Sequence, residues 1–159
     1  MNLLLRLALV LFQGRRGPRL GLLDTGSLHM RVWLTDLDVL MHMNNGRYLS
    51  LMDLGRVDLL VRSGFWQEAK RRGWFPVLGS ATVTYRRPLR LFERYRLDTR
   101  LASWDDRWFY LEQGFSRNGK LVAQATLKAM ILGPGGPVPT AEALSAIGIT
   151  AEPPRPLPL

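Results

Sequence analysis

The segment that most constrains the fold runs from Gly46 to Gly64, GRYLSLMDLGRVDLLVRSG. Its apolar residues recur with helical spacing on one face and also spread around the rest of the circumference. Asn44 or Asn45 is the expected N-cap, and Ser63 and Gly64 are expected to end the helix. A helix that is apolar over most of its circumference is usually enclosed by other structure. The sequence therefore predicts one long central helix wrapped by the remaining elements.

Several other segments have the alternation and the β-forming residues typical of strands. They are HMRVWL (29–34), FPVLGSATVTY (75–85), RYRLDTRLAS (94–103), RWFYLEQGFS (107–116) and LVAQATLKAMIL (121–132). Asn118 and Gly119 predict a hairpin between the last two, and Pro88 breaks the chain after the second. We expect one strand, the long helix and then four antiparallel strands in a meander, an α+β arrangement.

The length of 159 residues suits one domain with a core of its own. We place that domain at residues 26–135, after an N-terminal segment of residues 1–25 that is apolar and then basic. Residues 136–159 are expected to form a proline-rich tail. One helix against one sheet leaves edge strands exposed, so we expect a homo-oligomer, a dimer or a tetramer.

The composition excludes several kinds of site. The chain has no cysteine, which excludes disulfides, thiolate metal ligands and a cysteine nucleophile. Its two histidines, His29 and His42, are too few for a histidine-rich centre, so no metal is expected. A net charge of +9, with 19 arginines among the 22 basic residues, suits anionic partners: nucleic acid, anionic lipid, or a phosphate-bearing molecule such as coenzyme A. No nucleic-acid-binding motif is present, so we expect no nucleic acid.

The stretch LLLRLALVLF (3–12) is apolar except for Arg6, and GRRGPR (14–19) follows it. Ten residues are about half of what a membrane-spanning helix needs, and the charge order of a cleavable signal is absent. Two interpretations stay open. One is a short helix that packs on the domain or on a neighbouring subunit. The other is a peripheral membrane anchor whose Arg15, Arg16 and Arg19 face lipid phosphates. We expect a cytoplasmic protein, with membrane association as the alternative.

Polar residues gather immediately before the long helix: Asp36, Asp38, His42, Asn44 and Asn45. The first N–H groups of a helix have no intrahelical partner, and the helix dipole is positive there. Such a terminus stabilises a developing oxyanion. A carboxylate close by can attack a carbonyl carbon or activate water to do so. These are the parts that acyl transfer needs, without a metal.

The stretch DLDVLMHMNNGRYLSLMDLGRVDLL (36–60) resembles the signature of hotdog-fold acyl-CoA thioesterases of the 4-hydroxybenzoyl-CoA thioesterase type. In that signature, Asp-x-Asp-x-x-Gly-His-x-Asn-Asn-x-x-Tyr precedes the central helix. Together with WDDRWFYLEQGF (104–115), the stretch is more closely similar to thioesterase superfamily member six and its bacterial relatives. The resemblance covers residues 29–132. It implies the hotdog fold, a dimerising α+β domain whose central helix is wrapped by a curved antiparallel sheet of about five strands.

The resemblance places the catalytic carboxylate at Asp38, as general base or nucleophile. It also implies that the backbone N–H near Asn45 polarises the thioester carbonyl, and that His42 acts as a base or orients the substrate. The chain departs from the signature at Met41, where the family has glycine, which predicts a narrower acyl pocket or a re-aimed loop. Each assignment has a simpler rival: Asp38 as a turn residue, His42 as a hydrogen-bond partner of the loop, and Asn45 as a helix cap.

Three residues of the same motif are candidates for binding the substrate. Asp36 matches the first aspartate of the signature and is expected to cap or orient the loop. Asn44 matches the first asparagine, and the simpler interpretation is again a helix cap. Tyr48 matches the tyrosine, and the simpler interpretation is a core residue.

Three more candidates for binding the substrate follow the helix. Ser80 and Thr82 lie on a strand that is expected to face the site across a dimer interface. Arg87 is a candidate for binding coenzyme A phosphates through charge-assisted hydrogen bonds. Its simpler rival is a solvated arginine on the surface of the sheet.

Together these features predict an acyl-CoA thioesterase that hydrolyses a fatty-acyl or related thioester to free acid and coenzyme A. Coenzyme A belongs to substrate and product, so no cofactor is expected. Medium or long acyl groups are favoured by the apolar content. Three alternatives stay open: a non-catalytic hotdog module that binds acyl-CoA or acyl carrier protein; a hotdog hydratase or dehydratase, which the Asp-rich loop disfavours; and a basic protein that binds nucleic acid or membrane surfaces.

Overall fold

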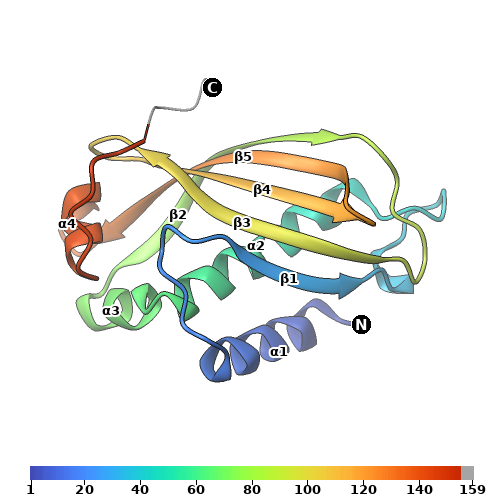
Figure 1. Cartoon of the computed structure of the whole chain (residues 1–159), viewed down its shortest axis with the longest axis horizontal. Helices are drawn as coiled ribbons and strands as arrows, with labels where there is room; N and C mark the ends of the chain where they lie inside the picture. The colour runs from blue at the N-terminus through green and yellow to red at the C-terminus, as the bar shows by residue number, and fades with distance from the viewer. Residues whose placement is uncertain (155–159) are drawn as a thin grey trace.

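The computed structural model describes residues 1–154, in which a curved antiparallel sheet arches over a long helix (Figure 1). The helices are α1 (Leu3–Arg16), α2 (Asn45–Arg62), α3 (Phe65–Arg72) and α4 (Thr140–Ser145), and a 3₁₀ turn, η1, spans Leu34–Asp36. The strands are β1 (Gly26–Arg31), β2 (Phe75–Tyr85), β3 (Arg94–Trp104), β4 (Phe109–Arg117), β5 (Lys120–Gly133) and β6 (Gly136–Val138). The sheet curled around α2 confirms the predicted α+β hotdog fold.

The strand order in the sheet is β1-β3-β4-β5-β2, and β6 pairs with the end of β5. The predicted meander is correct for β3, β4 and β5, but it is wrong for β2, which pairs with β5 rather than with β3. The position beside β3 is taken by β1, from Gly26 opposite Thr99 to Arg31 opposite Arg94. The chain therefore crosses from one edge of the sheet to the other between β1 and β2, and after β2 it returns to the position beside β1. Between β4 and β5, the left-handed backbone of Asn118 confirms the predicted hairpin.

Strand β1 begins and ends three residues earlier than predicted. After β1 the chain leaves the sheet and turns through η1, where the carboxylate of Asp36 accepts a hydrogen bond of 2.9 Å from the N–H of Trp33. Trp33 and Leu34, predicted as strand residues, therefore belong to the turn that brings Asp36 under the molecule's surface.

Helix α2 follows its prediction closely. The side chain of Asn44 caps it by accepting from the N–H of Gly46 at 2.8 Å, and it ends at Ser63, where Gly64 takes a left-handed conformation. The buried residues of its sheet-facing side include Tyr48, Leu51, Met52, Gly55 and Leu59.

The centre of α2 lies very close to the sheet at Gly55. A Cβ atom there would meet Thr99 Oγ1 at 2.5 Å and Gln113 Nε2 at 2.9 Å. The buried amide of Gln113 donates to Thr99 Oγ1 and to the carbonyl of Met52, and its oxygen accepts from Arg56. Every polar group of this buried network is paired, which fixes the height of α2 over β3 and β4.

Strand β2 lies at a free edge of the sheet and is exposed along most of its length. Its exposed side chains include Phe75, Leu78 and Tyr85. A long edge strand with apolar side chains offers unpaired backbone groups to another strand. This edge is the place where the predicted self-association would occur, and the association itself stays a prediction.

Helix α1 packs along α2, with Val10 and Gly14 buried between them. A Cβ atom at Gly14 would meet Val61 at 3.4 Å, so the two helices approach closely. Among residues 1–154, no helix is long and apolar enough to cross a membrane. Strand β6 and helix α4 were not predicted, and they lie in the segment expected to be a tail. Residues 155–159 of that segment lie outside the described residues.

Candidate functional site

The loop between β1 and α2 folds back on itself before it enters the helix. Leu37 forms a bridge with Met43, and the N–H of Asp38 donates to the carbonyl of His42 at 2.8 Å. The N–H of Asn44 donates to the carbonyl of Asp36 at 2.8 Å. These bonds hold Asp38 and His42 opposite each other, immediately before the N-terminus of α2.

Met41 stands at the turn of this loop with a φ of 61°. Only glycine takes such a left-handed conformation without steric cost, and other residues pay roughly 1–2 kcal/mol. The family that the chain resembles has glycine at this position, and glycine would take this backbone conformation without the strain that Met41 brings. The Met41 side chain is exposed and is not packed into the core.

Asp38 is half-buried, and its two carboxylate oxygens differ. Oδ1 accepts from the N–H of Leu40 at 2.9 Å and from the N–H of His42 at 3.3 Å. Within the described chain, no donor is bonded to Oδ2. One oxygen therefore fixes the carboxylate in the loop, and the other is available to a substrate or a water molecule.

The start of α2 leaves a backbone donor unused. The N–H of Gly46 is capped by Asn44, whereas the N–H of Asn45 has no acceptor among residues 1–154. The carbonyl of Asn45 accepts from the hydroxyl of Tyr85 at 3.0 Å, which ties the start of α2 to the end of β2. An unpaired N–H at the positive end of a helix is a suitable donor to a developing oxyanion.

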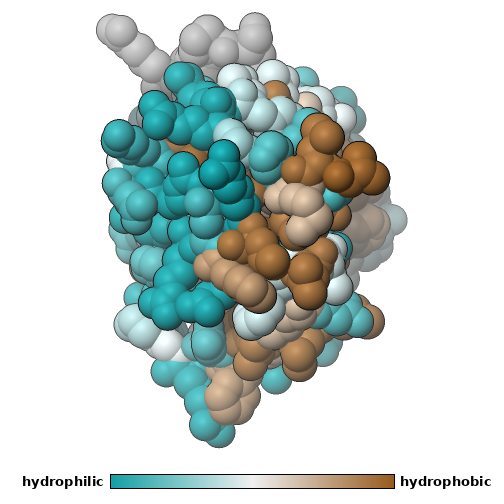
Figure 2. Space-filling view, turned by 90° about the vertical axis from the view of Figure 1, so that its right-hand side faces the viewer, coloured by the Kyte–Doolittle hydropathy of each residue, from teal (hydrophilic) through white to brown (hydrophobic). Residues whose placement is uncertain are grey.

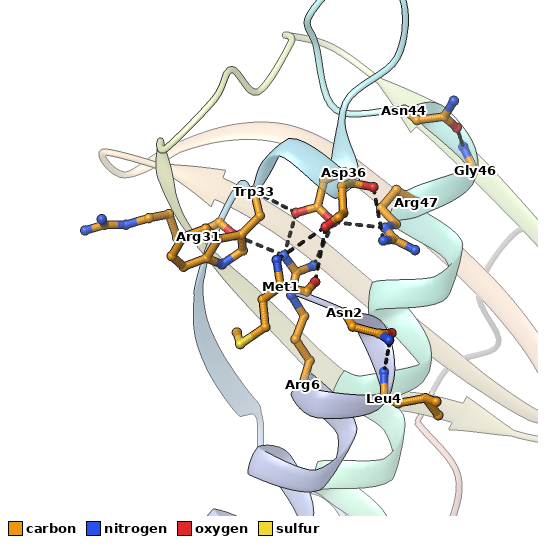
Figure 3. Close-up of polar contacts among 11 residues, drawn as sticks. Met1, Asn2, Leu4, Arg6, Arg31, Trp33, Asp36, Asn44, Gly46 and Arg47 are labelled. Atoms are coloured by element: carbon orange, nitrogen blue, oxygen red, sulfur yellow. Dashed lines mark hydrogen bonds and ion pairs between the residues drawn. The ribbon is translucent and has the colours of Figure 1, made fainter.

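Asp36 lies beneath the loop, where two arginines converge on it from α1 and α2 (Figure 3). Arg6 donates to both carboxylate oxygens, at 2.9 Å and 2.5 Å, and Arg47 Nε donates to Oδ1 at 2.9 Å. Burial by itself raises the pKa of Asp36, but the bonds from Arg6, the Trp33 N–H and Arg47 outweigh it and hold the pKa below its ordinary value of 3.8. Asp36 thus stays ionised, orienting the loop as the sequence predicts. A contact with substrate stays a prediction.

His42 is half-buried, and its backbone bridges to Arg90 of the loop that follows β2. In the part of the chain that the structure describes, its imidazole makes no hydrogen bond. Backbone bonds place His42 opposite Asp38 in the loop, and the role of the imidazole in catalysis or in orienting substrate stays a prediction.

Tyr48 is buried in the core, where its ring packs edge-on against Tyr85 and Phe115 at centroid distances of 5.2 Å and 5.0 Å. Burial, with Tyr85 beside it, raises the pKa of Tyr48 to about 12. The hydroxyl is therefore protonated at neutral pH, and the ring of Tyr48 packs against that of Tyr85.

Ser80 and Thr82 are exposed on β2, and Arg87 is exposed just after it. Within one chain, the β2 side chain that is hydrogen-bonded to the start of α2 in residues 1–154 is Tyr85, which was not among the predicted site residues. Ser80 and Thr82 lie five and three residues from Tyr85 along the free edge, so their predicted contact with substrate depends on a neighbouring subunit.

An apolar cavity of about 180 Å³ lies further along α2, between that helix and β2, β4 and β5. Its lining includes Leu60, Phe65, Val77 and Leu111, and Asp53 is a charged lining residue. Asp53 follows Asn45 by eight residues of helix, a distance of about 12 Å. The cavity thus lies beyond the start of α2 along the same helix. No group of His, Asp or Glu side chains suited to a metal ion is found in residues 1–154.

Arg6 and Arg47, the two arginine partners of Asp36, were not predicted from the sequence. Arg47 lies in the first turn of the helix, where a basic residue is unusual because the dipole opposes it, and this was an available signal. A second available signal was Arg6, the single charged residue in an otherwise apolar stretch. Neither signal identifies Asp36 as the common partner.

The thioesterase-like superfamily matches residues 32–145, which is more than half of the chain and includes the loop, α2 and the sheet from β2 to β6. The chain belongs to this superfamily. Its match begins after α1 and β1, so Arg6 lies outside the region that defines the superfamily.

Among curated proteins, the chain is 43% identical over 112 residues to Protein THEM6 of Xenopus laevis, covering 70% of this chain and 54% of that protein. It is 44% identical over 88 residues to Protein THEM6 of Danio rerio, covering 55% of this chain and 44% of that protein. The chain spans about half the length of these curated relatives.

Among solved structures, a gentisyl-coenzyme A thioesterase, BH1999, is similar with a TM-score of 0.68 at 21% identity, covering 76% of this chain and 99% of that one. At this identity, the likeness shows a shared fold.

Proposed function

We propose that this protein hydrolyses acyl-CoA thioesters to the free acid and coenzyme A. The observation that carries the proposal is that, among residues 1–154, Asp38 Oδ2 in the loop and the N–H of Asn45 at the start of α2 both lack a hydrogen-bond partner. Membership of the thioesterase-like superfamily supports this chemistry. A structural relative that is a gentisyl-coenzyme A thioesterase supports coenzyme A as the thiol component.

The chemistry follows from these two groups. The thioester carbonyl oxygen accepts from the N–H of Asn45, which stabilises negative charge as the carbonyl carbon becomes tetrahedral. Asp38 Oδ2 either takes a proton from the attacking water or attacks the carbon itself to form an anhydride that water then opens. In both routes the C–S bond breaks, the coenzyme A thiolate leaves and takes up a proton, and the carboxylic acid remains.

The apolar cavity along α2 receives the acyl chain in this proposal. Its position about 12 Å beyond the start of the helix suits medium or long chains rather than acetyl groups, because a short chain would not reach Leu60 or Phe65. Arg87 is exposed and forms no ion pair in the described chain, so it is free to bind coenzyme A phosphates.

A second copy of the chain completes the site in this proposal, by pairing along the free edge of β2. Apolar Phe75 and Leu78 on that edge support the pairing. Ser80 and Thr82 would then face the neighbouring subunit's α2. Dimers, or tetramers built from them, are the expected assemblies.

The test is release of free thiol from acyl-CoAs of increasing chain length by the native protein, with acyl-CoA binding measured in parallel. The expected result is turnover that is greatest for medium or long chains. Leu60→Trp, which fills the cavity, should shift the preference toward shorter chains and leave hydrolysis of the shortest substrates unchanged. Binding without thiol release from any acyl-CoA would contradict the proposal and would favour the non-catalytic acyl-CoA module.

A further inference from the structure

Helix α1 presents its apolar side chains to solvent. Its buried residues are Arg6, Val10 and Gly14, and the buried charge of Arg6 is neutralised by Asp36. On the opposite side, the outer face of α1 consists of Leu4, which is 72% exposed, together with the exposed Leu5, Leu9 and Phe12. A helix on a protein surface normally shows the reverse pattern, with polar residues outward.

The apolar surface continues beyond α1. Met1 and Thr35 are hydrogen-bonded to each other, which places the N-terminus of α1 beside the exposed Leu34. Exposed Phe92 packs edge-on against Trp33 nearby. Figure 2 views this end of the molecule. Hydrophobic residues gather in the right half of the view, and hydrophilic residues occupy the left half. Contiguous apolar surfaces of this kind mark sites of interaction.

Unpaired basic residues border the outer face of α1. Arg15 and Arg16 end the helix, and Arg16 lies over the ring of Phe12 at 4.2 Å. Among the described residues, no carboxylate forms an ion pair with Arg15, Arg16 or Arg19. Apolar and arginine side chains thus follow each other along one exposed helix.

A hollow of about 930 Å³ opens between α1 and strands β1 and β3, and it is lined by Arg31, Arg94, Arg96 and His29 together with Leu9 of α1. Arg31 and Arg94 stand directly opposite each other in the β1–β3 ladder. Like charges in that position destabilise a sheet, and in the described chain neither arginine has a carboxylate partner within ion-pair distance. The fold gives no reason for this pair, whereas an anion in the hollow would neutralise it.

We propose that the outer face of α1 docks on a lipid bilayer that contains anionic lipid, with a lipid phosphate bound between Arg31 and Arg94. Leu4, Leu5 and Leu9 enter the boundary between headgroups and acyl chains, and the arginines stay at the level of the phosphates. With 14 residues, α1 is too short to span the bilayer and lies in its surface. A second copy of the chain suits this face less well, because it would bring these arginines together and because the free β2 edge offers it backbone hydrogen bonds.

The test is co-sedimentation of the full chain with vesicles of phosphatidylcholine alone and of phosphatidylcholine mixed with phosphatidylglycerol. The native protein should bind the mixed vesicles, and the binding should weaken as salt is raised. Leu5→Gln/Leu9→Gln should lower the binding constant by about tenfold or more, because two leucines lose their apolar burial. Trp66→Gln/Leu121→Gln, a matched change of exposed apolar residues elsewhere, should leave it unchanged.

Charge is tested in the same assay. Arg31→Gln/Arg94→Gln should weaken binding to the mixed vesicles, and Arg71→Gln/Arg107→Gln, which removes the same charge from other elements, should weaken it less. The proposal is overturned if the native protein does not sediment with mixed vesicles, or if the two arginine pairs have equal effects. It is also overturned if Leu5→Gln/Leu9→Gln changes only the oligomeric state, or if Arg31→Gln/Arg94→Gln raises only the KM for acyl-CoA. Vesicle binding is measured without substrate, so its failure leaves the proposed hydrolysis untouched.

Discussion

The centre and the start of helix α2 are built in opposite ways. At the centre, Gly55 lies against Thr99 and Gln113, and the polar groups of that network are buried and paired. At the start, the Asn45 N–H and one oxygen of Asp38 have no hydrogen-bond partner among residues 1–154, and Met41 strains the loop. A tightly packed centre fixes the helix, so that its open end can present unsatisfied groups in a constant position. The proposed chemistry lies at this open end of the helix, where the packing is incomplete.

The largest expected effect on stability comes from the charged cluster that joins α1 to the loop. Asp36→Asn leaves Arg6 buried without its carboxylate, which should cost about 3–5 kcal/mol in the free energy of unfolding. Arg47→Met should cost clearly less, because the buried Arg6–Asp36 pair remains and Arg47 is partly exposed. Chemical denaturation of the two variants checks the ranking, and equal losses would contradict the account.

The same cluster makes stability depend on pH. The folded pKa of Asp36 lies below 3.8, its ordinary value. The unfolded chain therefore takes up its proton first as pH falls, so the contribution of Asp36 is complete above 3.8 and is lost as pH falls through the folded pKa. Native protein should lose stability more steeply in acid than Asp36→Asn. Parallel acid dependence in the two proteins would show that Asp36 is not the group responsible.

The centre of α2 is tested by Gly55→Ala. Its Cβ would lie 2.5 Å from Thr99 Oγ1, so the helix must shift, and overpacking of this kind costs about 1–3 kcal/mol. Alanine's better helix propensity offsets up to about 1 kcal/mol of that loss. Gly135→Ala is the control, since a Cβ atom added at Gly135 would have no neighbour within 4 Å among residues 1–154, apart from the two adjacent residues. Thermal unfolding should separate the two variants, and an unchanged midpoint for Gly55→Ala would refute the close approach.

The smallest expected effect is at the start of α2, in the strained loop. Met41→Gly removes left-handed strain of about 1–2 kcal/mol but gives the unfolded chain more freedom, so the net gain in stability should be under about 1 kcal/mol. Met41→Ala keeps both the Cβ and the positive φ, and its stability should match the native protein. A loss of stability in Met41→Gly would show that the methionine side chain, rather than its backbone, holds the loop.

The sequence predicted those elements whose signals are local. The apolar spread of α2 and its cap at Asn44 were readable because both lie within a few residues of the helix. Asp38, His42 and Asn45 were selected by one contiguous motif. The glycine that the motif has in place of Met41 was a signal of the left-handed backbone found there, but we interpreted the difference as a narrower acyl pocket or a re-aimed loop.

The rest depends on contacts between distant residues. Arg6 and Asp36 are 30 residues apart, and nothing near either one identifies the other. Strand β2 pairs with β5 because β1 already occupies the edge of β3. The period-two pattern of a strand does not say which strand it pairs with. Helix α3 was missed because its eight residues between Gly64 and Gly73 are too few for a helical period to be detected.

The most direct test of the central claim is the rate of thiol release by Asp38→Asn. The amide oxygen can still accept from the N–H groups of Leu40 and His42, so the loop should keep its fold while the negative charge is lost. Asp106→Asn serves as a control at an exposed carboxylate in the turn between β3 and β4. The account predicts that kcat falls by about 100-fold or more in Asp38→Asn, with unchanged unfolding and a native rate in the control. Thiol release by Asp38→Asn at the native rate would contradict it.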